Sequence, residues 1–259
     1  MDEATLRDKR KSGIHKLLKG LETGDPSSVN VIHPQTYIQH NPQTQTGREG
    51  LATLFARLSK TSPRVNFVRT FTDGDFVFAH TEYDFSTRRI GFEVFRFEGE
   101  HTVEHWDNIQ PRQGPNPSGH TMVDGPTQVQ DEAETEANRG LVTAFVREVL
   151  IERNLDQLAA FLSPGGFTQH SPELEDGIDA LRQALERSVD GQPTTTYARL
   201  HRVLAEGNFV LAVSEGERNG VHSAFYDLYR VADGTLTEHW DTVEAVAPTS
   251  EWKHDNGKF

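Results

Sequence analysis

The chain has 259 residues, 12 histidines, no cysteine and a formal net charge of −13 at pH 7. Without cysteine it can form no disulfide and has no thiolate for catalysis or for binding a metal. The negative charge argues against a nucleic-acid partner, because phosphates require a surface rich in lysine and arginine.

Hydropathy gives no sign of a membrane partner. The mean hydropathy is −0.61, and no segment approaches the roughly 18 consecutive apolar residues of a membrane helix. The start of the chain lacks the basic and apolar stretches of a signal peptide. We therefore expect a soluble, cytoplasmic protein with no membrane partner.

In the first half of the chain, helical periodicity comes before strand periodicity. Apolar residues at helical spacing predict a helix over residues 6–21, ended at Gly24, and a second over 47–60, which Pro63 stops. The period then becomes two, which predicts strands over 65–71, 76–80, 90–97 and 102–109. These elements form two helices followed by a four-stranded antiparallel meander.

The second half repeats this order. Helices are expected over 136–153 and 178–189. The predicted strands cover 195–205, 209–217, 222–231 and 236–243. Residues 111–136 between the halves are rich in Pro, Gly and acidic residues, which is typical of a linker.

Two motifs recur in both halves. Gln39-His40-Asn41-Pro42 is followed 130 residues later by Gln169-His170-Ser171-Pro172, and Glu104–Asp107 (Glu-His-Trp-Asp) recurs as Glu238–Asp241. A period of this length indicates two domains, each with its own core. We expect domain 1 over residues 1–124, a linker over 125–135 and domain 2 over 136–259. Within domain 1, residues 110–124 are either part of the linker or an ordered arm.

The predicted fold class is α+β, with two tandem cone-shaped barrels in which helices pack on one face of a curved antiparallel sheet. The interior of such a cone is a natural cavity for a small molecule. Segments 37–42, 47–50 and 103–111, and above all the His-Asn-Pro and Glu-His-Trp-Asp blocks, resemble the SnoaL-like branch of the nuclear transport factor 2-like superfamily.

This resemblance implies the cone fold and a range of activities. SnoaL-type proteins are polyketide cyclases that close rings by aldol chemistry, and relatives on the same fold include isomerases, dehydratases and ligand carriers. Such proteins often pair through their sheets, so we expect the two halves to form an intrachain pseudo-twofold pair. The whole chain is then a monomer or a weak homodimer, which light scattering after size exclusion can check; an obligate dimer that exchanges halves would contradict this expectation.

Two carboxylate pairs are candidates for acid–base chemistry. Asp107 and Asp241 are the first choice, because the resemblance implies an aspartate from the sheet, and a desolvated aspartate is a stronger base. The alternative is a structural ion pair. Glu93 and Asp227 form the second pair; the resemblance implies Asp at this position, so Glu93 departs from the pattern by one methylene.

Three histidines are further candidates. His40 and His170 either polarise a substrate carbonyl or bind loop backbone at the mouth of the cone. His80 has no counterpart, since Val213 is in its place. It is a base or donor if it points inward, and an exposed strand residue if it points outward.

Strand alternation groups these residues without showing which face is inward. His105 and Asp107 share one face of their strand, and Glu104 and Trp106 share the other. The aromatic residues are expected to be mostly core, and the following are candidates for ligand contact: Phe78, Phe92, Trp106, Tyr226 and Trp240. No compact ligand cluster or phosphate-binding loop occurs, so we predict no metal and no cofactor.

Two functions remain open at this point. One is cofactor-independent acid–base catalysis on a small apolar carbonyl compound, such as an aldol-type cyclisation or an isomerisation, with Asp107 or Asp241 as base and His40 or His170 as donor. The other is a small-ligand-binding or scaffold protein whose cavities have lost catalytic activity. A carboxylate and an imidazole that converge in an apolar cavity would favour the first.

Overall fold

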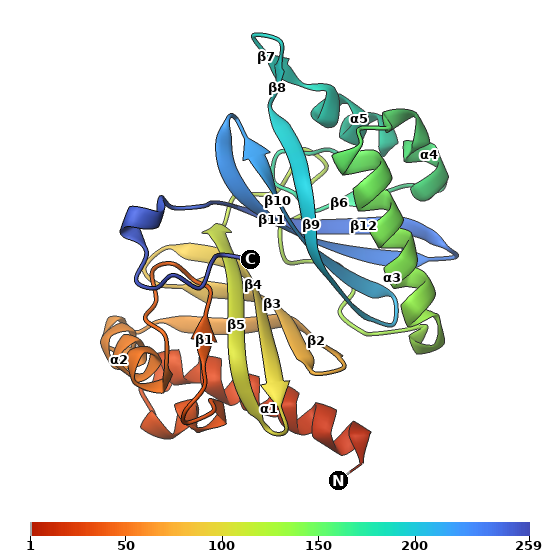
Figure 1. The fold of residues 1–259 in the computed structure, drawn as a ribbon. Helices are drawn as coiled ribbons and strands as arrows, with labels where there is room; N and C mark the ends of the chain where they lie inside the picture. Colours follow the sequence, from red (N-terminus) through yellow and green to blue (C-terminus); the bar gives the residue numbers. More distant parts are fainter. Residues whose placement is uncertain (1) are drawn as a thin grey trace. The chain divides into compact units, whose positions relative to one another are not determined.

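The computed structural model describes residues 2–259, and these form two compact units (Figure 1). The first unit contains the chain up to Pro111 together with the C-terminal tail, Ala247–Phe259. The second unit spans Arg112–Val246.

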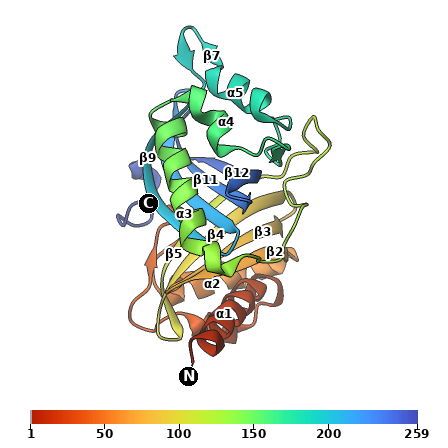
Figure 2. The same cartoon turned by 90° about the vertical axis from the view of Figure 1, so that its right-hand side faces the viewer.

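In the first unit, helices lie against one face of a five-stranded sheet (Figures 1 and 2). Its helical segments are α1 (Glu3–Thr23), a 3-10 turn (Pro26–Val31), α2 (Arg48–Leu58) and 3-10 turns at Ser59–Thr61 and, in the tail, Thr249–Glu251. Helix α1 begins at Asp2, whose side chain accepts a hydrogen bond from the Thr5 amide. It ends at Gly24, in the left-handed conformation that closes many helices.

The first sheet has the strand order β1-β5-β4-β3-β2. Its strands are β1 (Ile38–Gln39), β2 (Arg64–Asp73), β3 (Phe76–Asp84), β4 (Arg88–Glu98) and β5 (His101–Pro111). Strands β2 to β5 are the predicted antiparallel meander, and the short β1 pairs with β5 in parallel.

The second unit has the same topology, with the order β6-β12-β11-β10-β9. Its strands are β6 (Thr168–Gln169), β9 (Thr195–Glu206), β10 (Phe209–Arg218), β11 (Val221–Ala232), β12 (Thr235–Ala245) and a small hairpin of β7 (Ser188–Val189) and β8 (Gln192–Pro193). Its helical segments are α3 (Thr135–Ala144), a π-helical continuation (Phe145–Ile151), α4 (Leu158–Phe161), α5 (Ile178–Glu186) and 3-10 turns at Glu132–Glu134 and Leu155–Gln157. Helix α3 packs along β9 (Figure 2).

The predicted α+β class and its duplication are therefore confirmed, and each sheet has one more strand than expected. The extra strands β1 and β6 lie in the repeated Gln-His motif and pair with the repeated Glu-His-Trp-Asp motif. Gln39 faces His105, and Gln169 faces His239. The two motifs recur together because they form one structural feature.

The unit boundaries differ from the expected ones. Residues 112–124 belong to the second unit, where Asn116 Nδ2 donates to the Gln169 carbonyl at 2.6 Å. The tail beyond Ala247 belongs to the first unit, where Asn256 Nδ2 donates to the Gln39 carbonyl at 3.0 Å. Composition identified residues 111–136 as linker-like, but composition does not reveal these hydrogen bonds.

Each unit has its own apolar core between helices and sheet. In the first, Ile14, Leu17 and Phe55 pack against Val65 and Phe95. In the second, the corresponding cluster is built around Phe145, Leu181 and Tyr229. Among residues 2–259, no helix is long and apolar enough to cross a membrane.

Candidate functional site

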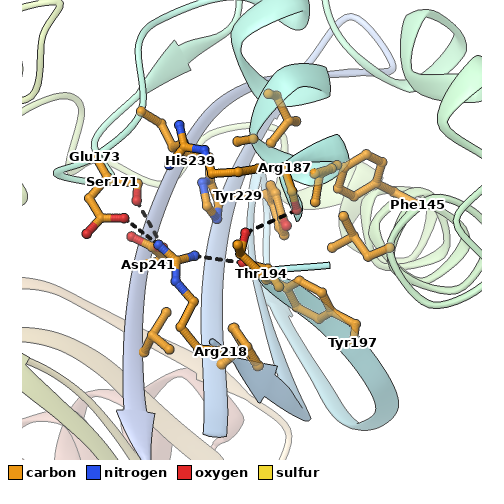
Figure 3. Close-up of a pocket in the computed structure, with 18 of the residues that line it drawn as sticks. Phe145, Ser171, Glu173, Arg187, Thr194, Tyr197, Arg218, Tyr229, His239 and Asp241 are labelled. Carbon is orange, nitrogen blue, oxygen red and sulfur yellow. Dashed lines mark hydrogen bonds and ion pairs between the residues drawn. The ribbon is translucent and has the colours of Figure 1, made fainter. Parts of the chain in front are cut away.

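Each unit contains a cavity on the side of its sheet that faces the helices. The cavity of the first unit measures about 170 Å³, and that of the second about 150 Å³ (Figure 3). Equivalent residues of the last strand line both: His105 and Asp107 in the first unit, His239 and Asp241 in the second. The histidine and the aspartate of each last strand therefore lie on the face of the sheet that the helices cover.

The opposite face of each sheet carries the residues expected to contact ligand. Neither of these cavities is lined by any of the five aromatic candidates, which are Phe78, Phe92, Trp106, Tyr226 and Trp240. The reason is strand alternation: Trp106 and Trp240 are each one residue from the inward-facing aspartate.

His40 and His170 also lie on this opposite face. Each imidazole stacks on the tryptophan of its unit, with ring centroids 4.6 Å apart. His40 Nε2 lies 2.9 Å from Glu104 Oε1, and His40 Nδ1 lies 2.8 Å from the Gly257 carbonyl. Burial alone would raise the pKa of Glu104, but hydrogen bonds from His40 and Arg96 outweigh it and lower that pKa. This geometry ties the tail to the sheet and keeps His40 out of the cavity.

His80 is buried and likewise does not line the cavity. Its ring stacks on Phe92 with centroids 4.5 Å apart, and its Nδ1 lies 2.9 Å from Arg69 Nη1. It is neither an inward base nor an exposed strand residue. The structure thus gives it a packing role on the far face of the first sheet.

In the first cavity, a glutamine, a histidine and a glutamate form a buried chain. Gln39 Oε1 accepts from the Asn41 amide at 3.0 Å, so the amide oxygen of Gln39 faces His105 Nδ1, 2.9 Å away. Nδ1 must therefore carry the proton of that hydrogen bond. His105 Nε2 lies 2.7 Å from Glu93 Oε2, and the Tyr83 hydroxyl donates to Glu93 Oε1 at 2.6 Å. One proton is thus held between an imidazole and a carboxylate.

The second cavity repeats this chain. His239 Nδ1 lies 2.9 Å from Gln169 Oε1, and His239 Nε2 lies 3.0 Å from Asp227 Oδ1. A tyrosine hydroxyl again donates to the carboxylate, from Tyr197 at 3.2 Å. Burial, and then the Asp227 charge, raise the pKa of Tyr197, so its hydroxyl keeps its proton and remains a donor.

The two tyrosines come from different strands. Tyr83 lies on β3 and packs over Gly91, whereas the position equivalent to Tyr83 in the second unit is Gly216, paired with Tyr197 of β9. A side chain at Gly216 would collide with the β9 backbone, since an added Cβ would lie 1.9 Å from the Thr196 carbonyl oxygen. The hydroxyl is conserved in space between the two units, although its sequence position is not.

The second pair of carboxylates differs between the units. Asp107 Oδ2 accepts from Asn41 Nδ2 at 2.6 Å, and its Oδ1 lies 3.6 Å from Nζ of the buried Lys258 in the tail. Asp241 Oδ2 accepts from Ser171 Oγ at 3.1 Å. Its Oδ1 accepts no hydrogen bond from any residue in the described range 2–259. Asp107 Oδ1 likewise accepts no hydrogen bond within these residues, so the two aspartates differ in the ammonium of Lys258, which lies beside Asp107 alone.

Burial raises the pKa of Asp241; the His239 charge opposes this effect and the Asp227 charge adds to it. When the pKa of a carboxyl is higher in the folded than in the unfolded state, the group contributes its full stabilisation below the unfolded pKa. This stabilisation is lost as pH rises through the folded pKa. Asp241→Asn removes the buried charge and should raise the melting temperature at pH 7 by about 2–4 °C, the shift that ~1 kcal/mol produces in a domain of this size.

Thermal unfolding measured from pH 4 to 8 checks this expectation. The difference between Asp241→Asn and wild type should shrink as pH approaches 4, because Asp241 then becomes neutral in both states. Asp156→Asn, at a fully exposed position, is the control and should change little. A lower melting temperature of Asp241→Asn at pH 7 would contradict the argument.

Two groups of side chains have the composition of a metal site. Glu93, His105 and Asp107 place one ligand atom each within 4.8 Å of one another, as do His120, Asp124 and His170. In the first group the ammonium of Lys258 already lies beside Asp107, and its charge disfavours a second cation.

Three features of the cavities were not among the candidates from the sequence. The sequence contained a sign of Gln39 and Gln169, because both copies of the motif have glutamine at this position. The sequence contained no such sign for Tyr83 and Tyr197, because they are at different positions when the two copies are aligned. Lys258 had none either, because it follows the last strand of the second copy and yet lies in the first unit.

Comparison with solved structures gives distant matches to single units. The chain is 20% identical to TsrD from Streptomyces laurentii, over 42% of this chain and 91% of that one, with a TM-score of 0.35. It is 20% identical to a candidate ketosteroid isomerase from Kribbella flavida, over 44% of this chain and 84% of that one, with a TM-score of 0.37. For a candidate polyketide cyclase from Acidithiobacillus ferrooxidans the identity is 16%, over 42% and 88%, with a TM-score of 0.33.

Sequence comparison gives one family. No curated protein matches the chain, but the family model described as SnoaL-like domain matches residues 142–239. This range runs from α3 to the His239 that lines the cavity. The chain therefore contains a SnoaL-like domain, which lies in the second of its two units of equal topology.

Proposed function

We propose that the cavity of the second unit binds a small carbonyl compound with an apolar body and moves a proton at the carbon beside the carbonyl. Such a transfer is the chemical core of an aldol-type cyclisation or an isomerisation. Asp241 is the base. The SnoaL-like match over residues 142–239 supports this class of reaction.

The observation that carries the proposal is the open oxygen of Asp241. Oδ1 is buried at the cavity wall and accepts no hydrogen bond within residues 2–259, while Ser171 holds Oδ2 and so fixes the direction of the carboxylate. Burial raises the pKa of Asp241. A carboxylate in this state is a stronger base than one in water and has a free lone pair for the substrate proton.

The enolate formed by proton removal needs a donor for its oxygen. The Asp227–His239 pair holds a proton at the same cavity, and the Tyr197 hydroxyl lies beside Asp227. The Gln169 oxygen fixes the His239 tautomer by accepting from Nδ1. Both ring nitrogens of His239 are thus engaged, so we assign the Tyr197 hydroxyl, which lines the same cavity and keeps its proton, as the donor in place of the His170 expected from the motif.

For the first unit we propose ligand binding without turnover. Asn41 donates to one oxygen of Asp107, and the buried ammonium of Lys258 lies 3.6 Å from the other, which accepts no hydrogen bond within residues 2–259. A substrate at this carboxylate would therefore meet a cation, which no described residue of the second unit places within hydrogen-bond distance of Asp241 Oδ1. The cavity retains its apolar lining, with Leu17 and Phe55 among the residues at the wall.

Exchange of carbon-bound hydrogen for deuterium tests the proposed function. Acetophenone, cyclohexanone and phenylacetaldehyde would each be incubated with the full chain in D2O, and loss of the proton signals beside the carbonyl followed by NMR. We expect exchange above the buffer rate for at least one compound that binds. Binding without acceleration would favour a ligand carrier, and absence of both would overturn the proposal for this class of compound.

A further inference from the structure

The lining of the two cavities differs in charge. Arg187 and Arg218 line the cavity of the second unit. Within the described chain, no lysine or arginine lines that of the first. This difference is unexpected for two copies of one fold in which the inward-facing aspartate and histidine positions are the same.

Position 218 accounts for part of the difference. Phe85 and Arg218 each lie 11 residues after the glycine that opens the middle hairpin, Gly74 or Gly207, and both line their cavities. An apolar ring in the first unit is thus replaced by a guanidinium in the second. The replacement changes the kind of ligand group that this wall can contact.

Arg218 is held ready to bind a carboxylate. Its Nη1 donates to Thr195 Oγ1 at 3.0 Å, and its Nη2 contacts the Glu173 carboxylate at 2.5 Å (Figure 3). Thr195 fixes the direction of the guanidinium. Glu173 is itself a carboxylate, and about half of its side chain is exposed.

A ligand carboxylate could replace Glu173 at low cost. Exposed ion pairs contribute only ~0–1 kcal/mol, so the release of Glu173 into water loses little. The equivalent residue in the first unit is Gln43, four residues after Gln39 as Glu173 is four after Gln169. The second unit therefore has both the Arg218 guanidinium and the Glu173 carboxylate that pairs with it, and the first unit has neither at the equivalent positions.

We infer that the second cavity takes a carbonyl compound that also carries a carboxylate, with Arg218 binding the carboxylate in place of Glu173. The inference rests on the proposed function for the position of the carbonyl, which lies at Asp241. A cavity of about 150 Å³ is the size that holds one benzene ring. The substrate class is thus a compact oxo acid.

Binding of benzoate, benzamide and phenyl phosphate to the full chain tests this inference by calorimetry. These probes share one ring and differ in charge. We expect benzoate to bind at least tenfold more tightly than benzamide and more tightly than phenyl phosphate. Arg218→Gln should remove the preference for benzoate and leave benzamide binding unchanged, which also reports that the cavity is intact. Glu173→Gln should tighten benzoate binding several-fold.

Arg57→Gln is the matched control, because it removes the same charge from an exposed helix position of the first unit and should change nothing. Equal affinity for benzoate and benzamide, no binding of benzoate, or an equal effect of Arg218→Gln on both would overturn the inference. Tighter binding of phenyl phosphate would replace carboxylate by phosphate as the anion.

The two proposals fail separately. If neutral ketones exchange in wild type and in Arg218→Gln alike and benzoate is not preferred, carboxylate binding at Arg218 is wrong and the proposed function stands. If benzoate is preferred through Arg218 but no carbonyl compound exchanges, carboxylate binding stands and the proposed proton transfer is wrong.

Discussion

Replacement of Asp241 by asparagine is expected to lower the rate of deuterium exchange by about 10²–10⁴-fold, the range that a positioned general base contributes. Asparagine has nearly the same shape, but its amide cannot accept a proton at neutral pH. The Asp241 carboxylate has one oxygen held by Ser171 and one open to the cavity. The rate is measured by NMR for whichever ketone wild type exchanges.

The same substitution in the first unit is the control. Asp107→Asn should leave the exchange rate within about twofold, because Asn41 holds one oxygen of Asp107 and the Lys258 ammonium lies 3.6 Å from the other. Circular dichroism of both variants checks that the units remain folded. Equal loss in the two variants would mean that both cavities react, and loss in Asp107→Asn alone would assign catalysis to the first unit.

Lys258→Met is expected to destabilise the first unit by about 3–5 kcal/mol, the cost of breaking a buried ion pair by removing one partner. The side chains of Lys258 and Asp107 are 3% and 6% exposed. Lys258 Nζ also donates to the Asp107 carbonyl at 2.8 Å. Methionine removes the donor to that carbonyl and the cation beside the carboxylate, which keeps only its hydrogen bond from Asn41. Denaturant unfolding of the full chain measures the loss.

Two further variants separate charge from packing. Lys253→Met removes a charge from an exposed position of the same tail and should change stability by less than about 0.5 kcal/mol. The double variant Lys258→Met with Asp107→Asn should recover part of the loss, because no buried charge remains unpaired. A Lys258→Met protein as stable as wild type would show that the ion pair contributes nothing.

Much of the fold followed from local signals. The helix over Glu3–Thr23 has apolar residues at helical spacing and a glycine at its end, and period-two alternation marked the meander strands. Those signals depend only on neighbours along the chain. Strands β1 and β6 were missed because two residues are too short for any period; they pair with distant residues through backbone hydrogen bonds.

The candidate site was predicted in part. Asp107, Glu93 and their counterparts Asp241 and Asp227 were named from the sequence, and they line the cavities or bond a histidine there. His40 and His170 were named from the repeated motif, with a role in loop hydrogen bonding as the alternative, and they lie on the opposite face. Alternation along a strand separates two faces but contains no information on which one the helices cover.

The sequence by itself determined that this protein is a duplicated α+β chain with a repeated pair of motifs, because residue type and spacing carry that information. Only the tertiary structure decided the chemistry of each copy. It brings Lys258 to Asp107 and Arg218 to the wall near Asp241, and it supplies the same tyrosine hydroxyl from two different strands. A charge or a hydroxyl acts through its distance and burial, and these arise from contacts between residues far apart along the chain.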